Sequence, residues 1–304
     1  MLAIIIPLYK IKHFEATLQS LAHQTDKRFT VYIGDDASPV DCTSLLQRYE
    51  GQFDFIYHRF ESNLGSKSLT EQWESCIALS AKEEWFMILG DDDYLSANFV
   101  ENFYFNYDVF NIQCNVVRYA TQVISEIKKE TSEVVINPLF ESGIGYLSRK
   151  ISGRTRGSLS EFVFKRSAFS KFGFTSYPSA FYSDDKVVLD LSVNQNIYSI
   201  NDALVSVRVS SDSLSGKAEI GKSDLFLARF LLFKYLFDVK YSLFATPIKK
   251  IVLERLLHYT VQYEKHNLIL FLKLYLRSIF FLDFKFFMKI NKKIIKLIIG
   301  KSIE

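Results

Sequence analysis

Residues 85–93 read WFMILGDDD, a short apolar run that ends at Gly90 and passes directly into three aspartates. An apolar run of this length between polar segments predicts a buried β-strand. Three adjacent carboxylates repel one another and lose hydration when they are grouped, so a fold does not keep them at a strand end for stability alone. A divalent cation resolves the repulsion, and oxygen ligands suit Mg²⁺ or Mn²⁺. The alternative is a solvated acidic turn in which Asp93 or Ser96 caps the next helix.

The first hundred residues alternate apolar runs with helical patterns. We expect strands at 2–6, 29–33, 53–58 and 85–89, and helices at 11–24, 43–49 and 68–80. This alternation with short connections predicts an α/β fold with a mostly parallel central sheet and flanking helices. The second strand also ends in adjacent aspartates, Asp35 and Asp36. Because ligands of open α/β sheets bind outside the carboxyl ends of the strands, two acidic strand ends predict a site at that edge.

Beyond residue 98 the pattern is looser. We expect strands at 116–123, 134–136 and 161–165, a strand pair within 197–209, and a mobile loop at 143–157. Arg154 and Arg156 lie in that loop and are either solvated or available to a ligand. Ser183, Asp184 and Asp185 open a further helix.

Composition and charge divide the chain in two. Counting Lys and Arg against Asp and Glu, residues 1–224 carry 22 against 29, and residues 225–304 carry 15 against 5. This split predicts a catalytic body over 1–224 and a basic C-terminal region that seeks an anionic surface. The three cysteines are far apart and show no metal-binding spacing, which is typical of reduced thiols in a cytoplasmic protein. We also expect no signal peptide, because residues 2–6 already form a strand.

Five segments in order resemble the family 2 glycosyltransferases over roughly residues 2–215. They are Ile4–Tyr9, the Ser20–Thr25 helix end, Asp35–Ser38 with Ala37 in place of the usual Gly, Asn63–Gly65, and Gly90–Leu95. The resemblance implies a GT-A-type nucleotide-diphospho-sugar transferase fold. Its nucleotide-binding half is expected at about 1–97 and its acceptor half at 98–224. It also implies an inverting, metal-dependent hexosyl- or N-acetylhexosaminyltransferase.

The resemblance also assigns donor-binding residues. Asp35 or Asp36 is expected to bind the nucleobase, and Asp91 the ribose. Asp92 is the expected metal ligand for Mn²⁺ or Mg²⁺, and Asp93 is either a second ligand or a support. The remaining expected contacts of the nucleotide sugar come from Pro7, Leu8, Tyr9 and Arg208; Tyr9 alternatively packs beside the sheet, and Arg208 alternatively has a structural role. Ser210 stands where many members carry a His, so a third metal ligand is in doubt.

Inverting transfer requires a general base for the acceptor hydroxyl. Asp184 and Asp185 resemble the family's Glu-Asp pair, which makes Asp185 the expected base and Asp184 a neighbour whose charge raises its pKa. The alternative is that Ser183 and Asp184 only cap the helix.

The basic C-terminal region predicts an interfacial helix rather than a transmembrane one. Lysines 285, 289, 292, 293 and 296 fall on one side of a helical wheel, and Phe287, Ile290, Ile294, Leu297 and Ile298 fall largely opposite. The alternative is a terminal helix packed on the body.

The expected protein is therefore a cytoplasmic enzyme, peripheral on the inner face of the cell membrane. Its expected donor is a nucleotide-diphosphate sugar, with UDP favoured, its acceptor is a polysaccharide or lipid-linked oligosaccharide, and it has no nucleic-acid partner. Two competing interpretations are a receiver-like Mg²⁺-binding signalling module and a catalytically silent membrane-associated scaffold.

Overall fold

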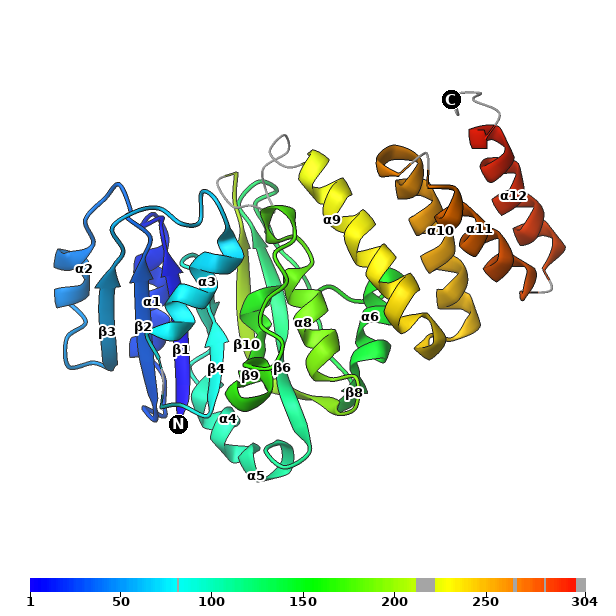
Figure 1. The fold of residues 1–304 in the computed structure, drawn as a ribbon. Helices are drawn as coiled ribbons and strands as arrows, with labels where there is room; N and C mark the ends of the chain where they lie inside the picture. The colour runs from blue at the N-terminus through cyan, green and yellow to red at the C-terminus, as the bar shows by residue number, and fades with distance from the viewer. Residues whose placement is uncertain (81, 212–221, 265–266, 282, 299–304) are drawn as a thin grey trace. The chain divides into compact units, whose positions relative to one another are not determined.

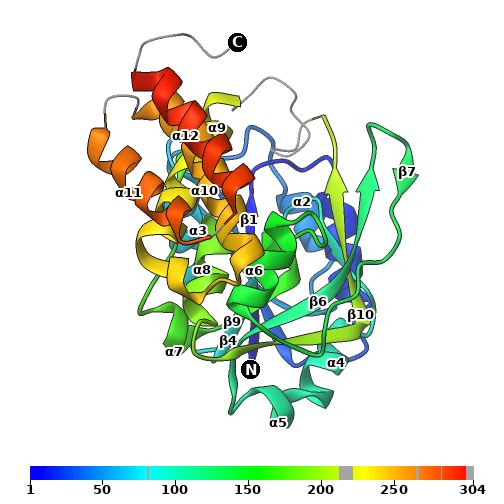
Figure 2. The ribbon, with the colours of Figure 1, turned by 90° about the vertical axis from the view of Figure 1, so that its right-hand side faces the viewer.

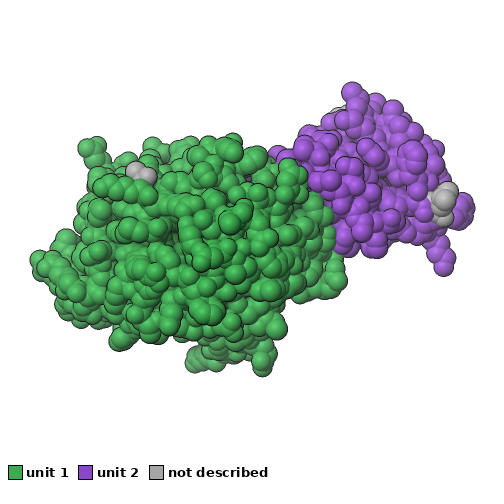
Figure 3. Space-filling view, turned by 90° about the horizontal axis from the view of Figure 1, so that it is seen from below, with its two compact units in different colours: residues 1–176, 183–220 green, residues 177–182, 221–304 purple. Residues whose placement is uncertain are grey.

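The chain divides into two compact units. A computed structural model describes residues 1–80, 82–211, 222–264, 267–281 and 283–298. One unit comprises Met1–Ser176 and Ser183–Ile220, and the other comprises Tyr177–Tyr182 and Gly221–Glu304 (Figure 3). The first is an α/β unit and the second is helical.

The N-terminal half of the α/β unit is a parallel sheet. Its strands are β1 (Leu2–Leu8), β2 (Phe29–Asp35), β3 (Asp54–Arg59) and β4 (Trp85–Ile88), in the order β3-β2-β1-β4 (Figure 1). The pairing places Ile4 of β1 between Val31 of β2 and Met87 of β4. The four predicted strands are confirmed, and β1 runs two residues further than predicted, through Pro7 to Leu8.

Helices cover both faces of this sheet, as expected for buried parallel strands. They are α1 (Phe14–Ala22), α2 (Thr43–Gln47) and α3 (Leu69–Ala78). Alternate residues of β1, from Leu2 to Leu8, join Phe14, Leu18 and Leu21 of α1 in one buried apolar cluster. The helix α3 lies on the opposite face from α1 (Figure 2).

The second half of the sheet is mixed. It continues from β4 in the order β9 (Phe162–Lys165), β6 (Cys114–Ser125), β10 (Asn196–Val209) and β5 (Tyr94–Leu95); the short strands β7 (Glu130–Thr131) and β8 (Phe140–Ser142) pair with β6 and β10. Only β6 and β10 are parallel here. The predicted strand pair at 197–209 is one long strand with a register shift between Ile200 and Leu204, and the predicted strand at 134–136 is reduced to one bridge, between Thr121 and Val135.

The prediction of a loop at 143–157 is wrong for its first nine residues. They form α6 (Gly143–Ile151), whose N-terminus is capped by Ser142: its Oγ accepts a hydrogen bond from Gly145 N at 3.0 Å. Burial of Tyr146 and Leu147 holds this helix in place despite its glycines. The other helices of this half are α4 (Phe99–Phe105), α5 (Tyr107–Phe110), α7 (Arg166–Phe169) and α8 (Ser183–Leu191).

The helical unit confirms the predicted helical C-terminal region. It contains α9 (Lys222–Tyr235), α10 (Thr246–Tyr263), α11 (Leu268–Ile279) and α12 (Phe284–Ile298). Within the described residues, no helix has the length and apolar character needed to span a bilayer.

The helical wheel of α12 agrees with the structure on its basic side and not on its apolar side. Lys285, Lys289 and Lys292 are exposed. Ile290 and Ile294, however, are buried, and α12 packs against α11 and α10. The apolar side expected to face lipid is therefore used for helix packing. The side chains of 293 and 296–298 lie outside the described part of the molecule.

Candidate functional site

The three aspartates follow β4 in a turn held by Ser160. Gly90 N donates to Ser160 Oγ at 3.1 Å, and Ser160 Oγ donates to Asp93 Oδ2 at 2.5 Å. A Cβ atom at Gly90 would lie 3.0 Å from Asp93 Oδ2 and 3.3 Å from Asp92 Oδ1. Glycine therefore allows the carboxylates to fold back against their own strand end.

Asp91 joins the ends of β4 and β1. Its Oδ2 accepts hydrogen bonds from Tyr9 N at 3.0 Å and Lys10 N at 2.8 Å. None of the described residues donates to Oδ1, so that oxygen retains its capacity to accept a ligand hydroxyl.

Asp93 is buried and both of its oxygens are occupied. Ser160 donates to Oδ2, and Arg208 N of β10 donates to Oδ1 at 2.8 Å. Burial raises the pKa of Asp93 to about 6, while the two hydrogen bonds oppose that rise. This geometry is that of a support for the turn, one of the two roles that the sequence left open.

Asp92 differs from both neighbours. It is partly exposed, and within the described ranges no group donates a hydrogen bond to its carboxylate. Burial, followed by the charges of Asp93 and Asp91, raises the pKa of Asp92 to about 7. A carboxylate without a donor beside two others fits a bound cation, which would compensate this repulsion.

The described residues contain no group of three or more His, Cys, Asp or Glu side chains arranged to hold a metal. A cation held here would take Asp92 from the protein and the rest of its shell from a ligand and water. Mg²⁺ is typically bound in this way, through one or two carboxylates and substrate phosphates.

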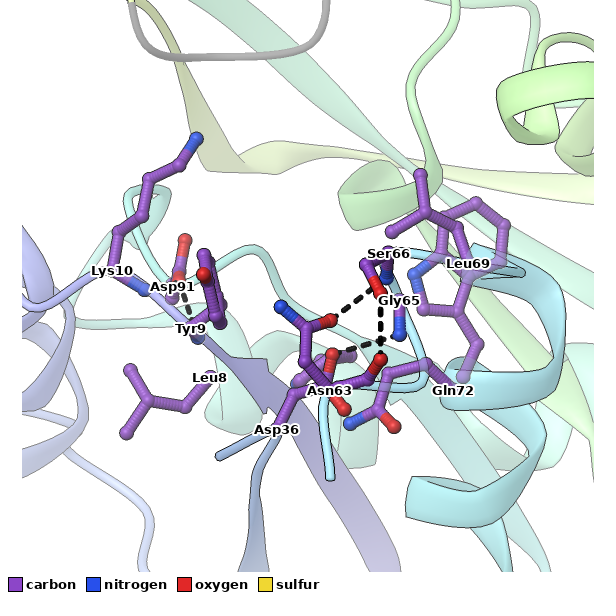
Figure 4. A pocket seen from close by; sticks show the side chains of 12 residues that line it. Leu8, Tyr9, Lys10, Asp36, Asn63, Gly65, Ser66, Leu69, Gln72 and Asp91 are labelled. Carbon is purple, nitrogen blue, oxygen red and sulfur yellow. Dashed lines mark hydrogen bonds between the residues drawn. The ribbon is translucent and has the colours of Figure 1, made fainter. Parts of the chain in front are cut away.

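A pocket of about 410 Å³ opens beside this turn, at the carboxyl ends of β1 and β2 (Figure 4). The structure brings five of the predicted residues into its wall: Pro7, Leu8, Tyr9, Asp36 and Asp91. The wall also contains residues that were not predicted, namely Lys10, Asn63, Gly65, Ser66, Leu69, Gln72 and Trp73. The motif at Asn63–Gly65 was a signal for two of these, whereas nothing in the sequence marked Gln72 and Trp73 on α3.

The adjacent aspartates Asp35 and Asp36 have different surroundings. Asp36 lines the pocket and accepts from Leu64 N at 2.7 Å and Gly65 N at 2.8 Å. Burial raises its pKa. Asp35 is fully buried outside the pocket wall. Its acceptor oxygens bind Tyr57 Oη at 2.6 Å, Arg59 Nη1 at 2.7 Å and Ser38 N at 2.7 Å. Of the two, Asp36 is the one placed to contact a ligand.

Ala37, which replaces the glycine usual in the resembled segment, has φ of +53°. This left-handed conformation costs any residue with a Cβ atom about 1–2 kcal/mol. The turn after Asp36 therefore requires a positive φ, which glycine adopts without strain, and this explains why glycine is usual at this position of the resembled segment.

The second acidic pair lies at the start of α8. Asp185 is buried: Lys150 Nζ lies 2.6 and 2.7 Å from its two oxygens, and Tyr146 Oη donates to Oδ1 at 2.8 Å. Asp184 is partly exposed. Burial and then the charge of Asp185 raise the pKa of Asp184 to about 7, although Lys150 opposes the rise. Asp184, which the sequence analysis treated as the neighbour of the base, is thus a carboxyl group with a raised pKa.

The segment 158–161 connects the two acidic sites. Ser160 holds Asp93, and the adjacent Glu161 is close enough to Asp184 to raise its pKa further. Glu161 is itself buried and paired with Arg118 at 2.7 Å and Arg156 at 3.2 Å. Arg156 therefore contributes to this internal network, whereas Arg154 is exposed.

Arg208 lies beside the acidic turn, but its guanidinium is engaged. Its Nε donates to the Asp92 carbonyl oxygen at 3.2 Å, and its Nη1 pairs with Glu126 at 3.0 Å. The backbone and side chain of Arg208 thus both brace the turn.

Comparison with known proteins agrees with this geometry. The family model for glycosyl transferase family 2 matches residues 3–171, more than half of the chain. The chain belongs to glycosyl transferase family 2. This family membership supports transfer of a sugar and removes the receiver-like signalling module as an interpretation.

Solved structures share the fold of this glycosyltransferase at low sequence identity. S. aureus TarS 1–349 in complex with UDP-GlcNAc is 14% identical with a TM-score of 0.64, covering 97% of this chain and 81% of TarS 1–349. The mannosyltransferase PcManGT from Pyrobaculum calidifontis, in complex with GDP-Man and Mn²⁺, is 12% identical with a TM-score of 0.54, covering 99% and 88%. The predicted GT-A-type fold is confirmed. No curated protein matches the sequence.

Proposed function

We propose that this protein is an inverting glycosyltransferase that moves a hexosyl or N-acetylhexosaminyl group from a nucleotide-diphosphate sugar to a saccharide hydroxyl. The observation that carries the proposal is the pocket at the carboxyl ends of β1 and β2, with Asp91 in its wall. Next in sequence is Asp92, whose carboxylate receives no hydrogen bond from the described residues. The structural neighbours are complexes with UDP-GlcNAc and GDP-Man, and we favour a UDP-sugar.

The donor nucleoside occupies the pocket. Pro7, Leu8 and Tyr9 provide its wall at the end of β1. Asp36 accepts from a ring N–H of the base, since, unlike Asp35, it lies in the pocket wall and is held by backbone N–H groups alone. Asp91 accepts from a ribose hydroxyl through Oδ1 while its Oδ2 remains on the β1 backbone.

The diphosphate lies next to Asp92, which would hold Mn²⁺ or Mg²⁺. When bound, that ion neutralises the charge that develops on the diphosphate leaving group. The turn that carries Asp92 is held by hydrogen bonds of Asp93 with Ser160 and with Arg208 N. We therefore assign Asp93 to supporting this turn rather than to the role of a second metal ligand.

We propose Asp184 as the general base, in place of the Asp185 expected from the sequence. A base must reach the acceptor hydroxyl and take up a proton near neutral pH. Asp184 is partly exposed with a pKa of about 7, whereas both oxygens of Asp185 bind Lys150. As the hydroxyl oxygen bonds to the anomeric carbon, the bond to the diphosphate breaks and the hydroxyl proton passes to Asp184.

We propose a surface polysaccharide or lipid-linked oligosaccharide as the acceptor, reached at the cytoplasmic face of the membrane. The basic C-terminal region, with 15 Lys and Arg against 5 Asp and Glu over residues 225–304, supports peripheral attachment to an anionic surface. A silent scaffold with the same fold is the competing function.

Thermal shift with a panel of nucleotide sugars and Mn²⁺ tests the donor, because a ligand of the folded state raises the melting temperature. The stabilising donor is then incubated with a saccharide acceptor and the product linkage is read by NMR. We expect an inverted anomeric centre; a donor that binds but is never transferred would favour the scaffold.

A further inference from the structure

The helix α11 has two apolar sides, and among the described residues of the helical unit one of them is buried. Leu270, Phe271, Leu274 and Ser278 are buried. The remaining apolar side chains stay exposed, among them Ile269 at 72% and Phe280, the residue after the helix, at 81%. The full exposed set is Leu268, Ile269, Leu272, Tyr275, Leu276, Ile279 and Phe280.

These seven residues form one continuous stripe. At about 100° per residue they cover an arc of roughly 140°, and Lys273 and Arg277 follow at one edge. A monomeric protein rarely leaves so many adjacent apolar side chains in water, so such a stripe marks an interaction site.

The neighbouring helix α12 extends this surface. Phe284, Met288 and Ile295 are exposed on one side of it, beside the exposed Lys285 and Lys292. The two helices pack against each other (Figures 1 and 2). We call the ten exposed apolar residues and their flanking cations the α11–α12 surface.

The charge of the α11–α12 surface selects its partner. Residues 268–298 contain seven Lys and Arg and a single acidic residue, Asp283, which pairs with Lys250 of α10. Two copies joined face to face would bring Arg277, Lys285 and Lys292 of one copy close to those of the other, which is unfavourable. An anionic bilayer accepts both features, because apolar side chains enter the boundary between headgroups and acyl chains while lysines remain among the phosphates.

We propose that the α11–α12 surface docks on an anionic lipid bilayer, with Phe280 and Phe284 among the inserted residues. This inference refines the membrane attachment proposed above and does not depend on the proposed reaction. It places the apolar contact on α11 and the Phe284 side of α12, since Ile290 and Ile294 of the predicted lipid-facing side are buried.

Sedimentation with vesicles tests the proposal, using a phosphatidylglycerol and phosphatidylcholine mixture against phosphatidylcholine alone. The full-length protein should bind the anionic vesicles. The double variant Leu276→Ser, Phe280→Ser should bind them more weakly by about tenfold or more. The double variant Lys285→Gln, Lys292→Gln should bind them about 30-fold more weakly, at roughly 1 kcal/mol per lysine, and high salt should weaken binding of the parent protein by at least as much.

Matched controls come from the α/β unit. Phe105 and Ile112 are 84% and 87% exposed there, so Phe105→Ser, Ile112→Ser removes similar apolar area and should leave vesicle binding unchanged. Lys128→Gln, Lys129→Gln is the corresponding charge control, since both lysines are exposed.

A gain-of-signal readout avoids dependence on loss of binding. Phe280→Trp should give a blue shift of tryptophan emission with anionic vesicles, and Phe105→Trp should give none. The proposal is overturned if the intact protein ignores the vesicles, if the two apolar double variants bind equally, or if Leu276→Ser, Phe280→Ser instead abolishes a dimer seen by light scattering.

Discussion

Lys150 Nζ lies 2.6 and 2.7 Å from the two carboxylate oxygens of Asp185. This ion pair fixes the buried Asp185 at the start of α8 and leaves its neighbour Asp184 partly exposed beside a negative charge. The pair therefore separates two adjacent carboxylates into one that is held and one that titrates near neutrality.

Asp184→Asn should lower the rate of transfer by about 10²- to 10⁴-fold and leave donor affinity unchanged, because the base acts on the acceptor hydroxyl. Asp185→Asn should instead destabilise the fold, by up to about 3 kcal/mol, since it removes the main counter-charge of the partly buried Lys150. Donor titration, steady-state kinetics and thermal unfolding of both variants separate the two effects. A stable Asp185→Asn protein that is inactive, together with an active Asp184→Asn protein, would return the base to Asp185.

The rate of transfer should rise with pH through a midpoint near 7, because Asp184 accepts a proton only when it is ionised and its pKa is about 7. Lys150→Met should move this midpoint to higher pH, since Lys150 favours the ionised form. The measurement is kcat against pH for both proteins at saturating donor. A profile that stays in place after Lys150→Met would exclude Asp184 as the titrating group.

Asp92→Asn should remove Mn²⁺-dependent donor binding and, without metal, raise the melting temperature. The raised pKa of Asp92 means that its ionised form is disfavoured in the folded protein. The free energy of unfolding is therefore highest below the unfolded pKa of Asp92, about 4, and falls as the pH rises through about 7. Calorimetric titration and thermal unfolding at pH 8 check both parts. Donor affinity that still depends on Mn²⁺ in the variant would contradict the metal assignment.

Ser160→Ala should lower stability by about 1–3 kcal/mol, because it removes the donor to the buried Asp93 and the acceptor of Gly90 N. Donor affinity should fall as well, since Asp92 lies between Asp91 and Asp93, whose carboxylates are held by hydrogen bonds. Ser152→Ala on the exposed end of α6 is the control and should change neither quantity. Equal donor affinity for Ser160→Ala and the parent protein would show that the turn does not need this clamp.

Ala37→Gly should stabilise the protein by up to about 1 kcal/mol. Glycine relieves the left-handed strain of about 1–2 kcal/mol at φ +53°. It also costs about 0.5–1 kcal/mol more backbone entropy than alanine on folding, which offsets part of this gain. Ala16→Gly within α1 should destabilise by about 1 kcal/mol and provides the matched control. Urea unfolding of the two variants gives the comparison, and a destabilised Ala37→Gly protein would refute the strain.

The sequence alone determined the N-terminal half of the fold and the edge at which the site lies. Runs such as 2–6 and 85–89 are short and apolar throughout, which is typical of a strand buried on both faces. The aspartates that follow Ile33 and Leu89 are local in sequence, so the acidic strand ends could be read directly. The glycines and serines of 143–157, in contrast, favoured a loop, and burial of Tyr146 and Leu147 overrode that local preference.

Only the tertiary structure decided which aspartate of each acidic group is free of side-chain partners and can contact a ligand. Asp35 is held by Tyr57 and Arg59, Asp93 by Ser160, and Asp185 by Lys150, and each of these partners is more than 20 residues away. Adjacent aspartates are chemically alike, so their roles depend on which long-range donors reach each carboxylate. The same holds for α12, which packs against α11 and α10 with Ile290 buried and Phe284 in solvent. A helical wheel gives the faces of a helix but not the neighbour that covers one of them.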